Sequence, residues 1–460
     1  MSSIVQWDSS LISRYDMAGP RYTSYPTAVQ FREDISILDL KRALHLSRKQ
    51  KKPLSLYIHV PFCANICYYC GCNKVITKNR GYSEPYVERL IKEITSVSKD
   101  LSRDQVVEQI HFGGGTPTFL TTDQIGRIIG ALKDNFQFAD NADCDFSIEI
   151  DPREADWTVM GALREHGFNR ISLGVQDFNT DVQIAINRLQ SFEQTQVIIE
   201  AARTLQYRSV NIDLIYGLPK QTVEKFSKTV KEVIGLQPDR LSVFNYAHLP
   251  DRFKPQRRIN ESDLPSSPEK LRILQNTIEQ LTSVGYHYIG MDHFALADDE
   301  LAYAQEEGTL YRNFQGYTTH GHCDLIGFGV SAISQIGDFY CQNTSDLSLY
   351  EESIKRGDPA IKRGLICNED DRIRRAVIQQ IICHFYLDFS KIEQQFGIDF
   401  KSYFRELFPQ LQAMAKDNLL ELTNDKLIVH NSGRLLVRSV CMMFDNYLTQ
   451  EMPQRFSRVI

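Results

Sequence analysis

Short apolar stretches alternate with stretches of helical periodicity through the first 290 residues, and this alternation limits the fold more than any other feature. The expected strands are residues 54–60, 109–112, 146–150, 170–175, 210–215 and 241–245. The expected helices are residues 82–97, 121–136, 156–166, 192–205, 223–236 and 268–284. Such alternation is typical of parallel strands joined by helical crossovers. It indicates an α/β fold, either an open doubly wound sheet or an incomplete (β/α)6 TIM-like barrel.

Unusual polar and glycine residues follow the expected strands, which favours the barrel. They are His59, residues 113–116, Glu149, Asp151, Gln176, Asp213, Asn245, Tyr246 and His248. In a parallel β/α barrel, the residues that perform the chemistry converge at the carboxyl ends of the strands. The alternative is that Gly, Asn and Asp only mark loops. That alternative does not explain Gln176 or the paired acids.

The α/β alternation does not extend over the whole chain, and the sequence predicts four parts. Residues 1–50 are expected to form an N-terminal arm that contributes to the active site, with a turn-rich stretch at 19–27. Residues 51–290 are expected to form the partial barrel. Residues 291–360 are expected to form a connecting segment that completes the substrate and cofactor site. Residues 361–460 form a mostly α-helical C-terminal domain. Helices are expected at 372–385, 391–396 and 433–447, with a hairpin at 419–429.

Composition excludes several classes of protein. Hydrophobic residues make up 42% and charged residues 24% of the chain, which is ordinary for a globular protein, and the formal net charge of -6 offers no basic excess for nucleic acid. No apolar run reaches the roughly 18–20 residues of a membrane helix. The first ten residues lack the pattern of a secretory signal, so we expect a cytoplasmic protein. No long amphipathic repeat is evident, and we expect a monomer.

Four of the ten cysteines lie within ten residues, at Cys63, Cys67, Cys70 and Cys72. The first three are separated by three and then two residues, and three thiolates with this spacing can hold three corners of an iron–sulfur cube, which leaves one iron open. A structural zinc site is an alternative, but its paired cysteines are usually well separated in sequence. A redox Cys-x-x-Cys motif is a further alternative and needs only two cysteines. The six scattered cysteines are expected to be small buried hydrophobes.

The cysteine loop after the first strand resembles that of the radical S-adenosylmethionine superfamily. Further segments are similar to one family within it, the oxygen-independent coproporphyrinogen III oxidases (dehydrogenases) of heme biosynthesis. These segments are residues 19–27, 57–63, 70–74, 111–118, 149–154, 174–178, 211–219, 244–248, 312–319 and 455–460. The resemblance runs from about residue 5 to the C-terminus. The cysteine loop alone indicates only the superfamily, whereas Cys72, the arm and the Arg312 segment are more specific.

The resemblance implies an oxidoreductase. Cys63, Cys67 and Cys70 would hold a [4Fe-4S] cluster whose open iron binds S-adenosylmethionine, and reductive cleavage would yield a 5′-deoxyadenosyl radical. The radical would remove a hydrogen from the β-carbon of a propionate, and loss of carbon dioxide and one electron would leave a vinyl group. On rings A and B, this converts coproporphyrinogen III to protoporphyrinogen IX. A flavodoxin-type protein would supply electrons.

The resemblance also implies two S-adenosylmethionine molecules. Residues expected to contact the first are Tyr57, Gly114, Glu149 and Ile333, and those expected to contact the second are Tyr69, Gly115, Thr116, Gln176, Arg188, Asp213 and Ala247. On the residues alone, the acids among them can instead cap helices, and the arginine can instead lie on the surface. Cys72 is expected to have a catalytic role near the cluster without binding iron.

The substrate carries four propionates on a macrocycle and therefore needs cations and aromatic walls. Arg21 and Arg312, each next to aromatic residues, are the candidates, although either can instead brace loops. His320 and His322 depart from the family pattern and are interpreted as tolerated loop substitutions.

Two other functions compete with this interpretation. A heme chaperone related to the family is the first, but that group typically lacks the Cys72 position and the arm. A radical S-adenosylmethionine enzyme with another substrate is the second, and the Arg312 segment argues against it.

Overall fold

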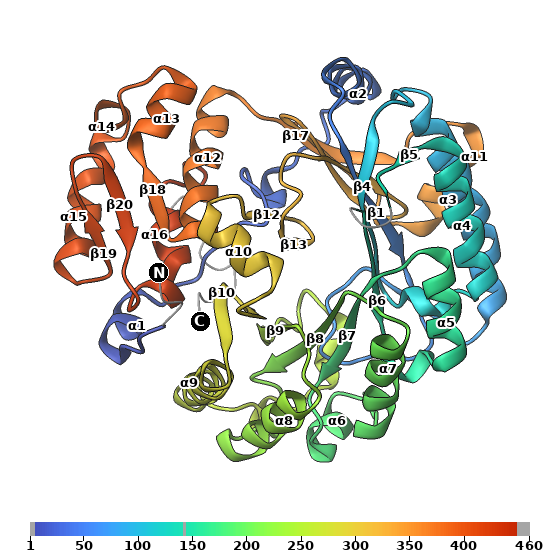
Figure 1. Cartoon of the computed structure of the whole chain (residues 1–460), viewed down its shortest axis with the longest axis horizontal. Coiled ribbons are helices and arrows are strands. Elements are labelled where there is room, and N and C mark those ends of the chain that lie inside the picture. The colour runs from blue at the N-terminus through green and yellow to red at the C-terminus, as the bar shows by residue number, and fades with distance from the viewer. Residues whose placement is uncertain (1–4, 141–143, 449–460) are drawn as a thin grey trace. The chain divides into compact units, whose positions relative to one another are not determined.

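The computed structural model describes residues 5–140 and 144–448 (Figure 1). The chain divides into two compact units. The barrel unit comprises residues 31–270 and 322–366, and the helical unit comprises residues 1–30, 271–321 and 367–460. The expected four-part organisation stays a prediction.

A long sheet forms the core of the barrel unit. Its strand order is β9-β8-β7-β6-β4-β1-β14-β15-β16-β17, and β5 (Gln137–Phe138) pairs with β4. The parallel strands are β1 (Leu54–Val60), β4 (Val106–Gly114), β6 (Asp145–Ile150), β7 (Arg170–Gln176), β8 (Ser209–Tyr216), β9 (Arg240–Asn245) and β14 (Asp324–Phe328). Beyond β14 follow the antiparallel strands β15 (Ile333–Ile336), β16 (Phe339–Asn343) and β17 (Ile361–Ile366).

Amphipathic helices alternate with these parallel strands and cover their outer face (Figure 1). They are α3 (Ser83–Ser98), α4 (Thr122–Asn135), α5 (Trp157–His166), α7 (Phe192–Thr204) and α8 (Val223–Gly235). The chain leaves the barrel unit in the first turn of α9 (Ser267–Ser283). Local sequence fixes where they begin. The Thr121 side chain accepts from the backbone N–H of Gln124, whose side chain binds back to the Thr121 backbone, and Ser191 and Gln194 do the same at α7. The unit also contains α2 (Ile37–Gln50), α6 (Thr180–Ala185) and α11 (Leu347–Arg356).

The partial barrel predicted from the sequence is confirmed. Each of the six expected strands and each helix between them is present, with ends that differ by a few residues at most. The sequence did not predict that β14 extends the parallel sheet by pairing with β1, from Leu54 opposite Asp324 to Ile58 opposite Phe328. Glycine and serine interrupt this region, so its strands are too short to be recognised by their hydrophobic pattern.

The helical unit is built mainly from short helices. They are α1 (Ser9–Tyr15), α10 (Glu300–Glu307), α12 (Glu369–His384), α13 (Phe389–Phe396), α14 (Phe400–Tyr403), α15 (Phe408–Lys416) and α16 (Val437–Met443). Its strands are β10 (Tyr286–Gly290), β11 (His293–Leu296), β12 (Tyr311–Asn313), β13 (Gly316–Thr318), β18 (Tyr386–Asp388), β19 (Leu420–Leu422) and β20 (Lys426–Val429). The predicted hairpin is β19–β20, to which β18 adds a third strand. The predicted terminal helix is shorter than expected, and segment 455–460 lies outside the described residues.

The turn-rich arm is ordered without being a helix or strand, as the sequence predicts. Tyr22 and Tyr25 are buried, and the Tyr22 hydroxyl donates to Asp445 Oδ2 at 2.9 Å. The buried Arg438 guanidinium donates to the carbonyl oxygens of Gly19 and Pro20. The arm is therefore held by the end of the same unit, through hydrogen bonds to its backbone.

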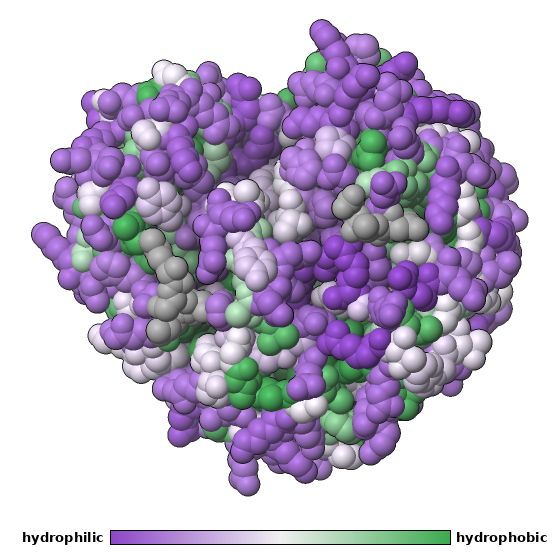
Figure 2. Space-filling model, viewed as in Figure 1, coloured by the Kyte–Doolittle hydropathy of each residue, from purple (hydrophilic) through white to green (hydrophobic). Residues whose placement is uncertain are grey.

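Among residues 5–140 and 144–448, no helix is long and apolar enough to cross a membrane. The face in Figure 2 is mostly hydrophilic, and its apolar residues occur in small groups.

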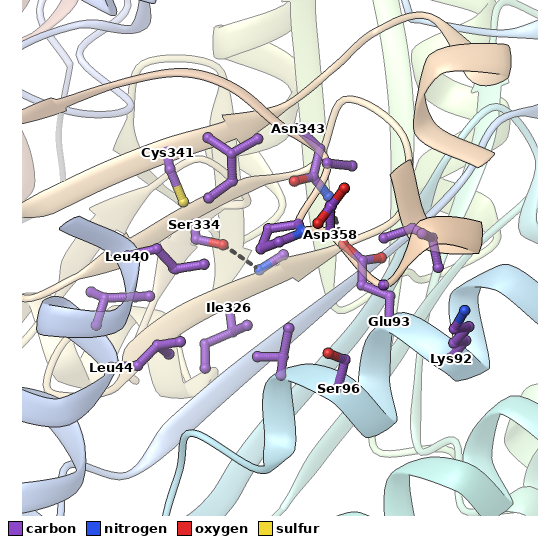
Figure 3. A pocket seen from close by; sticks show the side chains of 18 residues that line it. Leu40, Leu44, Lys92, Glu93, Ser96, Ile326, Ser334, Cys341, Asn343 and Asp358 are labelled. Carbon is purple, nitrogen blue, oxygen red and sulfur yellow. Dashed lines mark hydrogen bonds between the residues drawn. The ribbon is translucent and has the colours of Figure 1, made fainter. Parts of the chain in front are cut away.

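A cavity of about 70 Å³ lies between α2, α3 and the strands β14–β17 (Figure 3). Leu40 and Leu44 line one side and Glu93 and Asn343 another. Glu93 is buried, and its carboxylate accepts from Gly329 N at 2.8 Å, Asn343 Nδ2 at 2.8 Å and the Tyr350 hydroxyl at 2.7 Å. Burial raises the pKa of Glu93 above its ordinary value. This carboxyl group joins α3 to the connection after β14 and to β16 and α11.

Glu93→Ala should destabilise the protein by about 2–4 kcal/mol, because it leaves buried donors without an acceptor. Thermal unfolding followed by circular dichroism measures the effect as a lower midpoint. Glu88→Ala, at an exposed position of the same helix, is the matched control. Equal midpoints for the two variants would contradict a structural role for Glu93.

Candidate active site

A cavity of about 310 Å³ opens at the carboxyl ends of the parallel strands of the barrel unit. It brings together most of the site residues predicted from the sequence: Cys63, Cys67, Tyr69, Cys70, Cys72, Gly114, Gly115, Thr116, Glu149, Gln176, Arg188 and Asp213. These residues come from β1, β4, β6, β7, β8 and the loops that follow them. The barrel topology explains how positions up to 150 residues apart in sequence converge.

The cysteine loop is held at both of its ends by backbone hydrogen bonds. Strand β2 (Phe62–Cys63) pairs in parallel with β3 (Val75–Ile76), so the loop leaves and returns at one place. Cys70 N donates to Cys67 O at 3.3 Å, which closes a turn between these two ligand candidates. Lys74 Nζ donates to the carbonyl oxygens of Cys70 and Cys72, at 2.9 and 3.3 Å. Three cysteines are thus presented from a short loop with a fixed backbone.

The glycine run after β4 lets two backbones approach closely. A Cβ on Gly115 would lie 2.8 Å from Phe62 O and 3.0 Å from Cys63 Sγ. Gly114 has φ of +121°, and a Cβ there would lie 2.8 Å from His59 Cε1. Gly115 N donates to Val60 O at 2.8 Å. Side chains larger than hydrogen are excluded here, so the glycine backbone can lie directly against the cysteine loop.

Arg188 is buried rather than on the surface. Its Nη1 lies 2.9 Å from Asp151 Oδ2 and 3.6 Å from Cys67 Sγ, and its Nη2 donates to Gly174 O. Arg153 pairs with the same carboxylate at 2.6 Å. Burial alone would raise the pKa of Asp151, but the two guanidinium groups lower it below its ordinary value. The cavity therefore contains a fixed positive group beside a cysteine sulfur.

Glu149 does not cap a helix. Its Oε2 accepts from Gly114 N at 3.2 Å, and its Oε1 lies 3.3 Å from His111 Nε2. The His111 ring stacks on Tyr57, with ring centroids 5.8 Å apart. The carboxylate is thus aligned next to the glycine run, where it can accept a hydrogen bond from a ligand.

Asp213 is a second carboxyl group in the cavity that does not cap a helix. It accepts from Ser172 Oγ at 2.9 Å and from Asn211 Nδ2 at 2.8 Å. Burial, followed by the negative charge of Glu149, raises the pKa of Asp213 to about 6. Asp213 is therefore mainly ionised at neutral pH and becomes protonated under mildly acidic conditions.

Several buried polar atoms at the strand ends have no hydrogen-bond partner within the described residues. They are Gln176 Oε1, Arg188 Nε and Asn245 Oδ1. Gln176 also has φ of +69°, in the left-handed region, at the point where β7 ends. Buried polar groups are normally satisfied, and strained backbone gathers at ligand sites. Three thiols, a backbone cradle and unsatisfied polar atoms fit an iron–sulfur cluster with a polar cofactor beside it.

Cys72 lies in the same cavity as the three ligand candidates. A hydrogen bond from the Cys72 thiol and the nearby Lys74 ammonium lower the pKa of Cys70 to about 5. The same hydrogen bond raises the pKa of Cys72 well above its ordinary value. Cys72 is thus the protonated member of this pair.

Three of the predicted cofactor residues do not line the cavity: Tyr57, Ala247 and Ile333. The Tyr57 ring stacks on His111, and the Tyr57 hydroxyl lies 3.1 Å from His59 Nδ1. Ala247 follows β9, and Ile333 begins β15. Their roles stay predictions.

The two predicted substrate arginines belong to the helical unit and lie close together. Arg21 Nη1 pairs with Asp292 Oδ2 at 2.7 Å. Arg312 is buried, its guanidinium carbon lies 4.8 Å from the centroid of Tyr317, and its Nε donates to Arg21 O at 3.4 Å. Arg312 Nη1 has no hydrogen-bond partner among the described residues. Both arginines brace the arm, and a role in substrate binding stays a prediction.

Sequence reasoning missed Arg153 and assigned no role to Asp151 beyond its place at a strand end. Both line the cavity, and Arg153 Nη2 lies 3.8 Å from Cys67 Sγ. The signal was available, since an acid and an arginine flank Pro152 directly after a strand that ends in the cavity.

Comparison with known proteins agrees with this architecture. The family model of the Radical SAM superfamily matches residues 57–233, and that of the HemN C-terminal domain matches residues 367–436. The partial barrel and its cysteine loop thus define a radical S-adenosylmethionine enzyme. Membership of this superfamily implies a [4Fe-4S] cluster and S-adenosylmethionine as cofactors.

Relatives of known name match along nearly the whole chain. The oxygen-independent coproporphyrinogen III oxidase of Pseudomonas aeruginosa is 65% identical over 460 residues and covers 100% of both chains. That of Escherichia coli is 51% identical and covers 99% of both. A solved structure of the Escherichia coli coproporphyrinogen III oxidase, described as a radical SAM enzyme, has a TM-score of 0.92 at 50% identity and covers 96% of this chain and 100% of that one. The chain belongs to the oxygen-independent coproporphyrinogen III oxidase family.

Gly115→Ala should lower the iron and sulfide content of the purified protein, because the new methyl group would collide with the backbone of the cysteine loop. Gly130→Ala is the control. It lies in α4 with no atom within 4 Å of the new Cβ, and should stabilise the helix by up to about 1 kcal/mol. Iron and acid-labile sulfide analysis of both variants measures the difference. Full cluster content in Gly115→Ala would contradict the tight approach.

Proposed function

We propose that this enzyme converts coproporphyrinogen III to protoporphyrinogen IX by oxidative decarboxylation of the propionates on rings A and B. The observation that carries the proposal is the convergence of Cys63, Cys67, Cys70 and the glycine run in one cavity, in a chain 65% identical to a named oxidase of this type. The cluster and S-adenosylmethionine, when bound, supply a 5′-deoxyadenosyl radical that takes hydrogen from the propionate β-carbon. The protein's part is to bind, orient and exclude water.

Cys63, Cys67 and Cys70 are the proposed cluster ligands. Three thiolates leave one iron free for the amino and carboxylate groups of S-adenosylmethionine. Gly114 lines the cavity without a side chain, so a ligand can approach its backbone closely, and Glu149 can accept a hydrogen bond from the ammonium group or from a ribose hydroxyl. Tyr57 and Ile333 complete the proposed first site.

The second proposed S-adenosylmethionine site is formed by Tyr69, Gly115, Thr116, Gln176, Arg188, Asp213 and Ala247. Two features support it. Gln176 Oε1 and Arg188 Nε are buried without a partner among the described residues, so they can meet a polar ligand without breaking an existing bond. The ion pair with Asp151 fixes the orientation of Arg188, whose remaining N–H is suited to a carboxylate.

Cys72 is proposed as a catalytic residue near the cluster. Its thiol lines the same cavity as the three proposed cluster ligands, so it can donate hydrogen or a proton to a group bound there. Arg21 and Arg312 are proposed to bind propionate groups, for which the unpartnered Nη1 of Arg312 is suited. A flavodoxin-type protein is the proposed electron donor. The enzyme is proposed to be a cytoplasmic monomer that acts without nucleic acid or a membrane.

Anaerobic turnover tests the proposed function. Reconstituted protein is given reductant, S-adenosylmethionine and coproporphyrinogen III, and mass spectrometry follows vinyl porphyrin and 5′-deoxyadenosine. We expect two vinyl groups per product and a requirement for S-adenosylmethionine, and a large loss of vinyl product in Cys72→Ser with its cluster retained.

Other outcomes would overturn the proposal in different ways. Deoxyadenosine without vinyl product would indicate a radical enzyme with another substrate. Neither product, together with tight heme binding, would indicate a heme chaperone of the same superfamily.

Binding of S-adenosylmethionine should weaken as the pH falls through about 6, because protonation removes the acceptor that Asp213 offers. Well below that pH, the ionised fraction falls about tenfold per pH unit. Equilibrium binding between pH 5 and 8 measures the profile. Asp213→Asn should bind more weakly at pH 8 and lose this pH dependence, whereas the exposed Asp181→Asn should behave as the wild type. An unchanged profile in Asp213→Asn would exclude Asp213 as the titrating group.

A further inference from the structure

A second group of metal-binding side chains lies at the opposite ends of the strands. Glu108 is the third residue of β4, and His322 and Cys323 directly precede β14. Strands β4 and β14 both flank β1, and Leu54 pairs with Val107 on one side and with Asp324 on the other. This register brings the amino-terminal ends of the two strands together. Six residues of β4 separate Glu108 from Gly114, which is about 20 Å.

The three side chains converge on one carboxylate oxygen. His322 Nε2 lies 2.7 Å and Cys323 Sγ 3.5 Å from Glu108 Oε2. The oxygen, nitrogen and sulfur atoms that they offer all lie within 4.8 Å of one another. Tetrahedral zinc with ordinary bond lengths separates oxygen and sulfur ligands by about 3.5 Å and oxygen and nitrogen ligands by about 3.3 Å. For an ion to replace the hydrogen bond between His322 Nε2 and Glu108 Oε2, these two atoms would have to move apart by only about 0.6 Å.

We propose that Glu108, His322 and Cys323 bind one Zn²⁺ ion. Carboxylate, imidazole and thiolate are ligands that zinc accepts together. One carboxylate and one thiolate neutralise the charge of the ion, which suits a partly buried site. Binding displaces the proton of the Cys323 thiol into solvent. Water supplies the fourth ligand.

The simple alternative is an ion pair between His322 and Glu108. The His322 side chain is 57% exposed, and an exposed pair of this kind contributes little stability. With a plain ion pair, the Cys323 thiol only donates a weak hydrogen bond to the same carboxylate oxygen, at 3.5 Å. An ion pair does not explain why sulfur, nitrogen and oxygen meet at the start of β14. A zinc ion accounts for all three side chains, and fixes the start of β14.

Metal analysis of the cluster-loaded protein tests the proposal. Holoprotein with its full iron content is equilibrated with zinc alone, desalted and analysed for zinc and iron. We expect about one zinc ion per chain beyond the iron, and a zinc absorption-edge spectrum with one sulfur ligand at about 2.3 Å. His322→Ala and Cys323→Ser should each lose this zinc with iron content and turnover unchanged.

Matched controls separate this site from adventitious binding. His45→Ala alters an exposed histidine and Cys367→Ser a buried cysteine elsewhere, and both should retain the zinc. Glu108→Gln keeps the shape of the side chain and should weaken zinc binding even if the other variants fold poorly. Holoprotein that holds no zinc after equilibration, or zinc retained equally by His322→Ala and Cys323→Ser, would overturn the proposal.

Discussion

The close approach of the glycine run to the cysteine loop is the constraint on which the rest of the barrel unit depends. Gly115 N donates to Val60 O, and Thr116 N donates to Phe62 O, both at 2.8 Å. These bonds extend the parallel register of β1 and β4 beyond the sheet and into the loop. The thiols therefore take their positions from the sheet, and the loop needs no core of its own. A cluster site at the ends of strands is held rigidly, because the strands themselves are rigid.

The cavity is polarised by buried charged groups. Asp151 lies between two guanidinium groups, one of which also approaches Cys67 Sγ. Glu149 and Asp213 are instead hydrogen-bond acceptors, since Glu149 accepts from Gly114 N and Asp213 from Ser172 Oγ, and burial raises the pKa of Asp213. The cavity thus contains both fixed cations and fixed acceptors.

Local pattern explains which parts of this structure the sequence predicts. The six strands, their helices, the cap at Thr121 and the cysteine loop are each encoded within a few residues. The position of Arg188 is not, because its partners lie 37 and 121 residues away, and an isolated arginine is usually exposed. Strands β14–β17 are equally hard to predict, since their glycines obscure the hydrophobic pattern. At Gly327 a Cβ would lie 2.5 Å from Ile333 O, so the tight turn excludes the very side chains that would have signalled a strand.

The two ends of the sheet have contrasting chemistry for the same physical reason. Parallel strands bring distant residues together at both ends, but helix-forming crossovers leave the carboxyl ends open and bury much of the other end. The carboxyl end accordingly combines three thiols, unsatisfied polar atoms and a cavity, which suits ligands that must enter and react. The amino end combines Glu108, His322 and Cys323, whose ligand atoms lie within 4.8 Å of one another, which suits a single bound ion. His322 and Cys323 also stand where the chain enters β14, the strand that lies beside β1. An ion held there would restrain the start of β14, which pairs with β1, without taking part in the chemistry at the opposite end of the sheet.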